Sequence, residues 1–430
     1  MRRYESYKDS GVEWLGEIPS HWEMQRSKFL FKKIERKVKE IDQIVTCFRD
    51  GQVTLRANRR TDGFTNALKE HGYQGIRKGD LVIHAMDAFA GAIGVSDSDG
   101  KATPVYSVCL PYNKQKVNVY FYAYYLRNLA LSGFITSLAK GIRERSTDFR
   151  YADFAELLLP LPSYSEQQKI AQFLDDKTAK IDQAVDLAEK QIALLKEHKQ
   201  ILIQNAVTRG LNPDVPLKDS GVEWIGQVPE HWEVKQLKFE AHITLGKMLC
   251  TEYKRGFHLK PYLKSKNIQW LNVDTSSIDE MYFSSYELAL YKLEKGDLIL
   301  SEGGEVGKTC MWNNELDECY IQNSAHKVRL YKKNNNKYFL YLFFSCGHLG
   351  VFDSIVNRVS IAHLTKDKLE NMKFIFPTLA EQTAIADYLD KQTTKIDQAI
   401  ALKTVHIEKL KEYKSVLIND AVTGKVQVSV

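Results

Sequence analysis

The sequence consists of two related halves. Lys8–Glu23 (KDSGVEWLGEIPSHWE) and Lys218–Glu233 (KDSGVEWIGQVPEHWE) share twelve of sixteen residues at an offset of 210. A second block, Glu166–Val185, returns as Glu381–Ile400 at an offset of 215. Self-similarity on this scale indicates a duplicated architecture, and the drifting offset shows that the segments between the blocks differ in length. The sequence therefore predicts two halves, each with similar edges around a dissimilar middle.

The second repeated block predicts a long helix. Pro160 and Pro162 precede it, Ser165 with Gln168 forms a capping-box pattern, and no Gly or Pro follows until Gly210. Apolar residues recur every seven positions in both copies, which is typical of a coiled-coil seam. The seam candidates are Leu174, Ile181, Val185, Ile192 and Leu195 in the first copy, and Leu389, Ile396, Ile400, Ile407 and Leu410 in the second.

These helices are expected to pair with each other. At 1.5 Å per residue, residues 166–209 would extend about 66 Å, more than one small domain can cover. Packing of each helix on its own domain is the alternative. Duplicated halves related by a pseudo-twofold axis would make the pair antiparallel. Lys199 and Lys414 occupy equivalent seam positions, where we expect frayed or snorkelling side chains.

The dissimilar middles, roughly 24–160 and 234–376, mix strand-like runs such as DLVIH (80–84) and DLILS (297–301) with aromatic helical stretches at 120–131 and 338–344. This mixture predicts an α/β or α+β fold for each half. We therefore expect four segments: a globular domain over 1–159, a helix over 160–212, a second globular domain over 213–376 and a second helix over 377–430.

Composition excludes several classes of protein. The 430 residues suit two or three domains, with 44% hydrophobic and 27% charged residues, as in ordinary globular chains. The six cysteines form no CxxC pair, so we expect neither a disulfide framework nor a zinc finger, and Cys346 with His348 makes a weak metal candidate. The N-terminus lacks the apolar region of a signal peptide, and the longest apolar run, 339–344, is too short to span a membrane. We expect no metal, no membrane and a cytoplasmic location.

Catalytic motifs are not evident. SEGGEVGKT (301–309) follows a predicted strand, but a phosphate-binding P-loop needs four residues between its glycines, and only three separate Gly303 from Gly307. Glu302 stands where the first glycine belongs, and a carboxylate there would repel phosphate. A tight turn after the strand is the favoured interpretation. An autonomous P-loop enzyme and a coiled-coil scaffold without nucleic acid remain the alternatives to DNA binding.

Basic clusters in both middles point to DNA, although the net charge of +6 alone would not. Arginine and asparagine read base edges, whereas lysine mostly meets phosphate. A solvated surface is the competing interpretation of any single cluster. The candidate DNA-binding residues are Arg56, Asn58, Arg59, Arg60, Lys140, Arg143 and Arg145 in the first middle, and Lys247, Lys254, Arg255, Lys260, Lys264, Lys266, Asn267 and Arg358 in the second.

The repeated blocks resemble one family. KDSGVEWxGxxPxHWE, the helix start at 160–184 with its copy at 377–399, and the helix end NAVTRG (205–210) with AVTG (421–424) are similar to type I restriction–modification specificity subunits. PYLKSKN (261–267) and the two Lys-Gly-Asp-Leu turns also resemble the target-recognition domains of that family. The first middle departs from this pattern, its nearest stretch being LRANR (55–59).

The resemblance implies a non-catalytic subunit. Two target-recognition domains would be held on an antiparallel coiled coil, each reading one half of a bipartite, asymmetric DNA site. Two methyltransferase subunits and two restriction (translocase) subunits would be the partners, together with double-stranded DNA. The chain would then need no cofactor of its own, because S-adenosylmethionine, ATP and Mg²⁺ would belong to those partners.

Overall fold

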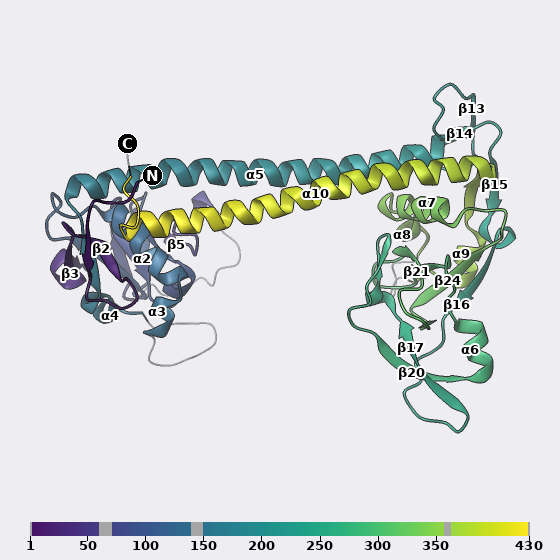
Figure 1. Cartoon of the computed structure of the whole chain (residues 1–430), viewed down its shortest axis with the longest axis horizontal. Coiled ribbons are helices and arrows are strands. Elements are labelled where there is room, and N and C mark those ends of the chain that lie inside the picture. The colour runs from purple at the N-terminus through teal and green to yellow at the C-terminus, as the bar shows by residue number, and fades with distance from the viewer. Residues whose placement is uncertain (1, 60–70, 139–148, 357–362, 429–430) are drawn as a thin grey trace. The chain divides into compact units, whose positions relative to one another are not determined.

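The computed structural model describes residues 2–59, 71–138, 149–356 and 363–428. The chain divides into two compact units, which are described separately below. Unit 1 comprises Met1–Glu189 with Thr404–Val430, and unit 2 comprises Lys190–Lys403. Each unit contains one globular part and a portion of each of the two long helices, α5 (Tyr164–Arg209) and α10 (Leu379–Val422) (Figure 1).

Unit 1 is built on a four-stranded antiparallel sheet in the order β4-β11-β8-β9. The central strand β8 shows why its first three residues are all apolar: Leu81 and Ile83 join the core beneath helix α2, whereas Val82 joins a second core on the opposite face. A strand with both faces buried loses the usual polar alternation. These elements are β4 (Phe31–Lys33), β8 (Leu81–His84), β9 (Ile93–Val95), β11 (Tyr106–Pro111) and α2 (Val119–Leu131).

The second face of this sheet is covered by two small antiparallel pairs, β5-β6 and β7-β10. Short elements complete the unit. They are β5 (Val45–Cys47), β6 (Val53–Leu55), the 3-10 turn Arg56–Asn58, β7 (Gln74–Ile76), the 3-10 turn Ala88–Ala90, β10 (Gly100–Ala102), α1 (Ser27–Leu30), α3 (Phe134–Ser137) and α4 (Tyr151–Glu156).

Unit 2 contains the same sheet in the order β16-β24-β21-β22. Leu298 and Leu300 of β21 face the core under helix α7, and Ile299 faces a separate core. The expected strands and aromatic helices are thus present in both units, and the antiparallel pairing makes the fold α+β. The elements are β16 (Ala241–Leu245), β21 (Leu298–Ser301), β22 (Thr309–Met311), β24 (Ala325–Leu330) and α7 (Asn336–His348).

Unit 2 differs from unit 1 in what covers the sheet. Its long strand β17 pairs antiparallel with β20 and parallel with β23. The remaining elements are β17 (Phe257–Leu263), the 3-10 turn Ser265–Asn267, β18 (Ile268–Gln269), β19 (Asn272–Val273), β20 (Asp279–Ser284), α6 (Ser285–Tyr291), β23 (Tyr320–Ile321), α8 (Val351–Ile355), α9 (Lys366–Asn371) and the 3-10 turn Leu237–Phe239.

The Lys-Gly-Asp turns brace each sheet. Glycine takes a positive φ in both, +89° at Gly79 and +95° at Gly296, a conformation that other residues rarely adopt. The aspartates that follow are almost fully buried and ion-paired with an arginine of the same unit, Asp80 with Arg36 and Asp297 with Arg329. This repeated motif is therefore structural.

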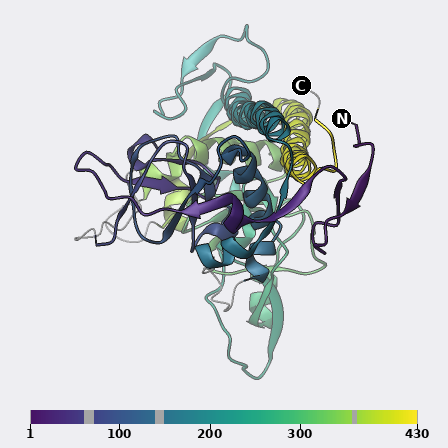
Figure 2. The same ribbon diagram turned by 90° about the vertical axis from the view of Figure 1, so that its left-hand side faces the viewer.

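The sixteen-residue block clamps the ends of the long helices. In unit 1, His21 lies 3.0 Å from Glu166 at the start of α5, and buried Trp22 packs beside Gly424, just after α10 ends. The block forms the hairpin β1 (Tyr7–Asp9) and β2 (Glu17–Pro19) followed by β3 (Glu23–Arg26), which pairs with β12 (Leu158–Leu161). The two chain ends meet here, through a bridge between Arg2 and Gln427 (Figures 1 and 2).

Unit 2 repeats the clamp with the helices exchanged. His231 lies 2.7 Å from Glu381 at the start of α10, and Trp232 packs beside Gly210 at the end of α5. The elements are β13 (Leu217–Asp219), β14 (Gln227–Pro229), β15 (Glu233–Gln236) and β25 (Lys373–Phe376). In both units the sixteen-residue block thus packs against the glycine that follows the end of a long helix, which explains why these two sequence motifs are repeated together.

The long helices pair antiparallel within each unit. Going forward along α5, contacts go backward along α10: Asp182 then Glu189 meet Lys414 then Lys411 in unit 1, and Gln191 then Lys199 meet Lys403 then Asp397 in unit 2. All ten seam candidates are buried or half-buried. Lys199 and Lys414 are half-buried, as snorkelling side chains would be, and each ends in a 2.7 Å ion pair with an aspartate of the opposite helix.

The helix start differs from the prediction by two residues. Ser163, not Ser165, caps α5, because its hydroxyl accepts a hydrogen bond from the backbone N–H of Glu166 at 3.3 Å. In α10 the same place is held by Thr378, which exchanges hydrogen bonds with Glu381. No helix among the described residues is both long and apolar enough to cross a membrane.

Candidate nucleic-acid interface

A cleft lined by arginines, two of which are ion-paired with Asp50 and Asp87 of the same lining, opens on the β5-β6 side of unit 1. It has a volume of about 700 Å³ and is walled by the β5-β6 hairpin, the end of β8 and the start of β11. Three arginines line it: Arg49, Arg56 and Arg59. Because arginine presents a planar fork of donors, such a cleft suits base edges and phosphates.

Two local contacts fix the position of the Arg59 side chain. Its guanidinium lies 2.6 Å from the carboxylate of Asp50 and 4.3 Å from the centroid of the Phe48 ring. Burial raises the pKa of the Asp50 carboxyl, but the hydrogen bonds from Arg59 and from the Gln52 backbone N–H, together with the charges of Arg59 and Arg127, outweigh it, and the net pKa lies below its ordinary value. Asp50 therefore stays ionised at neutral pH, and DNA must compete with it for Arg59.

Two further residues of the cleft carry hydrogen-bonding groups that sequence reasoning did not single out. His84 packs edge-on against Tyr106 with ring centroids 4.6 Å apart, and its Nδ1 accepts from the backbone N–H of Asp87. Burial lowers the pKa of His84, opposed by Asp87, so the ring is neutral at pH 7. No sequence signal marks this histidine, because His84 is distant from Arg49 and Arg56 in the sequence and comes close to them only when the strands pair.

The other candidates of the first middle are placed as follows. Arg56 is half-buried and its Nε donates to Thr46 Oγ1 at 3.3 Å, whereas Asn58 is exposed and donates to Thr54 Oγ1 at 2.9 Å. Both belong to the 3-10 turn that follows β6. Four more candidates of the first middle lie outside the described residues, namely Arg60, Lys140, Arg143 and Arg145, and so does Arg358 of the second middle.

In unit 2 the basic cluster separates into exposed and internally paired cations. Lys254 and Arg255 are exposed in the loop before β17, next to Tyr253, whose side chain is 69% exposed. Lys260, Lys264 and Lys266 surround β17 and its turn, but Lys260 pairs with Glu318, and Lys264 with Asp279. Lys266 is 3.9 Å from the same Asp279.

Two predicted DNA contacts are corrected by burial. Asn267 is 2% exposed, and its amide accepts from the backbone N–H of Lys264 and donates to two carbonyls, so no polar atom is left for a base. Lys247 is also buried, ion-paired with Glu287 and close to the Phe257 and Phe283 rings. Both residues hold the fold together, so the set of candidate DNA contacts in unit 2 is smaller than the sequence predicted.

The near-P-loop is a hairpin. Residues 302–308 connect β21 to β22, which pair antiparallel, whereas a P-loop leads from a strand into a helix. Lys308 is 2.6 Å from Glu305 and donates to Gln269 at 3.2 Å, and the Thr309 hydroxyl donates to the Gly307 carbonyl. Elsewhere in unit 2, the two residues of the weak metal candidate have other contacts: Cys346 is fully buried, and the His348 ring packs tilted against Phe344 and Trp270.

Comparison with known proteins agrees with this geometry. Residues 229–412 match the family described as type I restriction modification DNA specificity domain. A putative type I restriction enzyme specificity subunit, MjaX, of Methanocaldococcus jannaschii is 24% identical over 443 residues, covering 96% of each chain. Residues 229–412 thus carry the specificity domain of type I restriction–modification systems, and the chain is similar along nearly its whole length to a specificity subunit.

Solved structures share the fold of this chain. A chain from a structural study of type I restriction–modification complex assembly and conformational transition superposes with a TM-score of 0.69 at 16% identity, covering 95% of this chain and 99% of the other. The HsdS subunit of Thermoanaerobacter tengcongensis gives 0.55 at 18% identity, with 95% and 98% covered. The family fold thus extends over both units.

Proposed function

We propose that this specificity subunit selects the DNA sequence for a type I complex, each unit reading one half of a bipartite, asymmetric double-stranded target. One observation carries the proposal: the two units share a sheet and a helix clamp but present different side chains. Unit 1 offers a cleft with three arginines, and unit 2 offers a loop with Lys254, Arg255 and an exposed tyrosine. Different surfaces on one repeated frame are what an asymmetric target requires.

Duplication also meets a physical need. One small domain covers too few base pairs for useful specificity in a genome. When two domains are linked, the second binding event is intramolecular, and their specificities multiply.

The exposed apolar residues of the long helices support protein partners. In unit 1 these are Leu187 on α5 with Val405, Tyr413 and Val416 on α10; in unit 2 they are Leu194 and Ile201 on α5 with Leu402 on α10. Rows of exposed apolar residues on a helix favour docking of further helices. We propose that two methyltransferase subunits bind there and that two restriction subunits join them.

The chemistry is assigned to those partners. We propose that S-adenosylmethionine, ATP and Mg²⁺ are bound by them, and that this chain contributes recognition and positioning without an active site. Since its substrate would be intracellular DNA, we propose a cytoplasmic location.

Methylome sequencing tests the function directly. The chain is expressed with its methyltransferase subunit in a host free of other modification systems, and modified adenines are mapped. The expected result is one bipartite motif, and replacing residues 24–160 by the corresponding middle of a relative should change one half of it only. A continuous motif, or a change in both halves, contradicts the proposal. Salt-independent or absent DNA binding by the assembled complex favours a scaffold, and ATP binding by the isolated chain favours an enzyme.

A further inference from the structure

Arg127 of helix α2 has no bonded partner among the residues that the structure describes. Among the described residues it makes no hydrogen bond or ion pair, and its Nε is buried and unsatisfied. Its side chain runs past two glycines with positive φ: a Cβ on Gly51 would lie 2.8 Å from Arg127 Cδ, and one on Gly91 would lie 3.3 Å from Nε. Asp50 and Asp182 are close enough to interact electrostatically with the Arg127 guanidinium, but neither forms a hydrogen bond or an ion pair with it. A partly buried, unpaired guanidinium is costly unless something else pairs with it.

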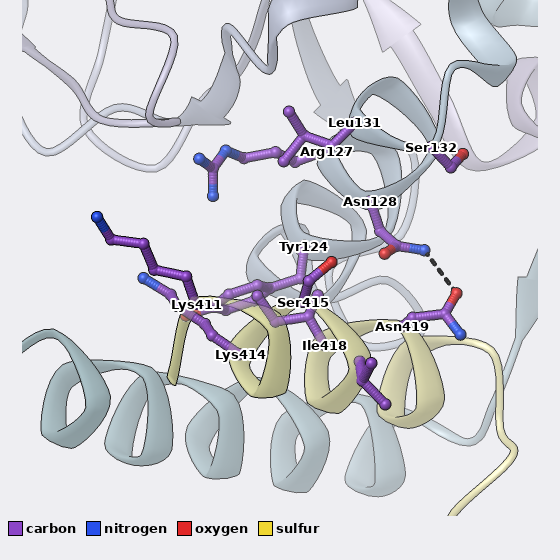
Figure 3. A pocket seen from close by; sticks show the side chains of 11 residues that line it. Tyr124, Arg127, Asn128, Leu131, Ser132, Lys411, Lys414, Ser415, Ile418 and Asn419 are labelled. Atoms are coloured by element: carbon purple, nitrogen blue, oxygen red, sulfur yellow. Dashed lines mark hydrogen bonds between the residues drawn. The ribbon is translucent and has the colours of Figure 1, made fainter. Parts of the chain in front are cut away.

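The guanidinium borders an open pocket of about 440 Å³ between α2 and α10, entirely within unit 1. Figure 3 shows the head groups of Arg127, Lys411 and Lys414 at the same end of this pocket. The lysines have partners across the helix pair, Glu189 at 3.8 Å and Asp182 at 2.7 Å. Leu131 and Val416 supply apolar walls, and their exposed fractions are 59% and 50%.

Unit 2 closes the equivalent position. The N-caps Asn118 and Asn335 align α2 with α7 at an offset of 217, and this offset places Phe344 where unit 1 has Arg127. Tyr124 and Tyr341 confirm the alignment, since each bonds to an aspartate and a threonine of its long helix. Phe344 is buried against Trp270 and His348. The pocket with a free guanidinium therefore belongs to one unit, not to the repeated frame.

We propose that the Arg127 pocket receives a carboxylate from an apolar helix of the methyltransferase partner, giving the partner bound at unit 1 an anchor that unit 2 does not offer. The inference rests on the proposed function, because it names one contact within that assembly. A guanidinium binds a carboxylate through two parallel hydrogen bonds, and here it would do so with the charge of Lys411 nearby.

The surroundings favour a protein carboxylate over a DNA phosphate. Leu131 and Val416 line the pocket beside the cations with apolar surface, which a phosphate backbone would leave uncovered. Asp175 and Asp182 line the adjoining cavity of about 300 Å³ and would repel a polyanion. A helix with apolar residues and one acidic side chain complements both features.

The test compares R127Q with wild type in two measurements. Glutamine keeps polarity and most of the length but removes the charge and the fork. Because hydrogen bonds to charged groups contribute strongly, binding of the methyltransferase subunit to the full-length chain should weaken about ten- to a hundredfold. The melting temperature of the isolated chain should stay equal or rise, since no internal bond is lost. K196Q, at the position equivalent to Lys411 in the other half, is the matched control and should leave binding unchanged.

Zero-length carbodiimide cross-linking identifies the occupant. Lys411 should couple to a glutamate or aspartate of the methyltransferase subunit, and the yield should fall in R127Q. Wild-type chain that fails to bind the methyltransferase contradicts the proposed function itself. Wild-type binding with equally tight R127Q overturns only the pocket proposal. A lower melting temperature for R127Q would also overturn the pocket proposal, because it would show a structural role for Arg127. Weaker DNA binding by a normally assembled R127Q complex would overturn it too, because it would show that Arg127 contacts a phosphate.

Discussion

The ion pair between Arg59 and Asp50 makes a quantitative prediction about DNA recognition. Their side chains are 39% and 49% exposed and 2.6 Å apart, so the pair stabilises the free protein by only about 0.2–1 kcal/mol. If Arg59 contacts a base, DNA must replace Asp50 as its partner. D50N should then strengthen binding of the cognate duplex about 1.4- to 5-fold. R59A should weaken it by about 1–3 kcal/mol and relax the sequence choice at one base pair.

The assay is a double-mutant cycle on the assembled complex. Fluorescence anisotropy of a labelled cognate duplex, and of duplexes altered at each position, gives the binding free energies of wild type, D50N, R59A and the double variant. Because Arg59 holds the pKa of Asp50 below its ordinary value, the D50N effect should not change between pH 6 and 8.

The cycle separates a specific exchange from a general field effect. If Asp50 acts through Arg59, D50N should do nothing in the R59A background. An equal gain in both backgrounds would refute the exchange, since Asp50 would then repel phosphate directly. A uniform loss for all duplexes in R59A would place Arg59 on the phosphate backbone instead.

Further predictions concern the interface, the helices and stability. K264A should lower the salt slope of binding by about one unit if Lys264 meets a phosphate, and an unaltered slope in a salt titration would remove it from the interface. Four residues inserted within 186–198 add about 6 Å of helix and should lengthen the non-specific gap of the methylated motif by one or two base pairs; an unchanged gap in methylome data would end the idea of a helical ruler. G424A should lower the unfolding free energy more than G11A in denaturant titrations, because both glycines have positive φ but only at Gly424 would a Cβ meet Trp22, 3.0 Å away. Burial raises the pKa of Glu240, but the hydrogen bonds from Asn334 and Lys333 and the charges of Lys333 and Lys235 together outweigh it, so its net pKa lies below the ordinary value of 4.5. The ionised Glu240 therefore stabilises the fold above about pH 4.5, and this stabilisation is lost as the pH falls below that; E240Q should flatten this acid limb in thermal melts.

Periodicity predicted the frame well. Strands β8 and β21, helices α2 and α7 and both long helices are marked by continuous apolar runs or seven-residue spacing, and these patterns depend only on neighbours in sequence. The cap at Ser163 was missed because both serines that flank Tyr164 fit the capping-box pattern, Ser163 with Glu166 and Ser165 with Gln168, so the pattern alone did not decide between them.

The interface was harder to predict, for an electrostatic reason. Counting charges along the chain made 247–266 look strongly cationic, yet the acids that neutralise it come from elsewhere: Glu318 is 58 residues from Lys260, and Asp279 is 15 from Lys264. Local counting cannot find such partners. The position of Arg127 was visible in principle, since aligning the two aromatic helices sets Arg127 against Phe344.

Residues that are repeated in the two halves make different contacts from residues that differ between the halves. Repeated residues fix a globular part to the helix ends or fix one helix to the other, as Trp22 and Trp232 do at the clamp and as Lys199 and Lys414 do in the seam. Residues that differ line the clefts and loops, or open a pocket at Arg127. Because the clamp and seam contacts do not involve the cleft residues, a change in the surface of either half leaves the helix pair intact. Duplication therefore allows each half to change its DNA surface independently, while the attachment of both halves to the helices is maintained.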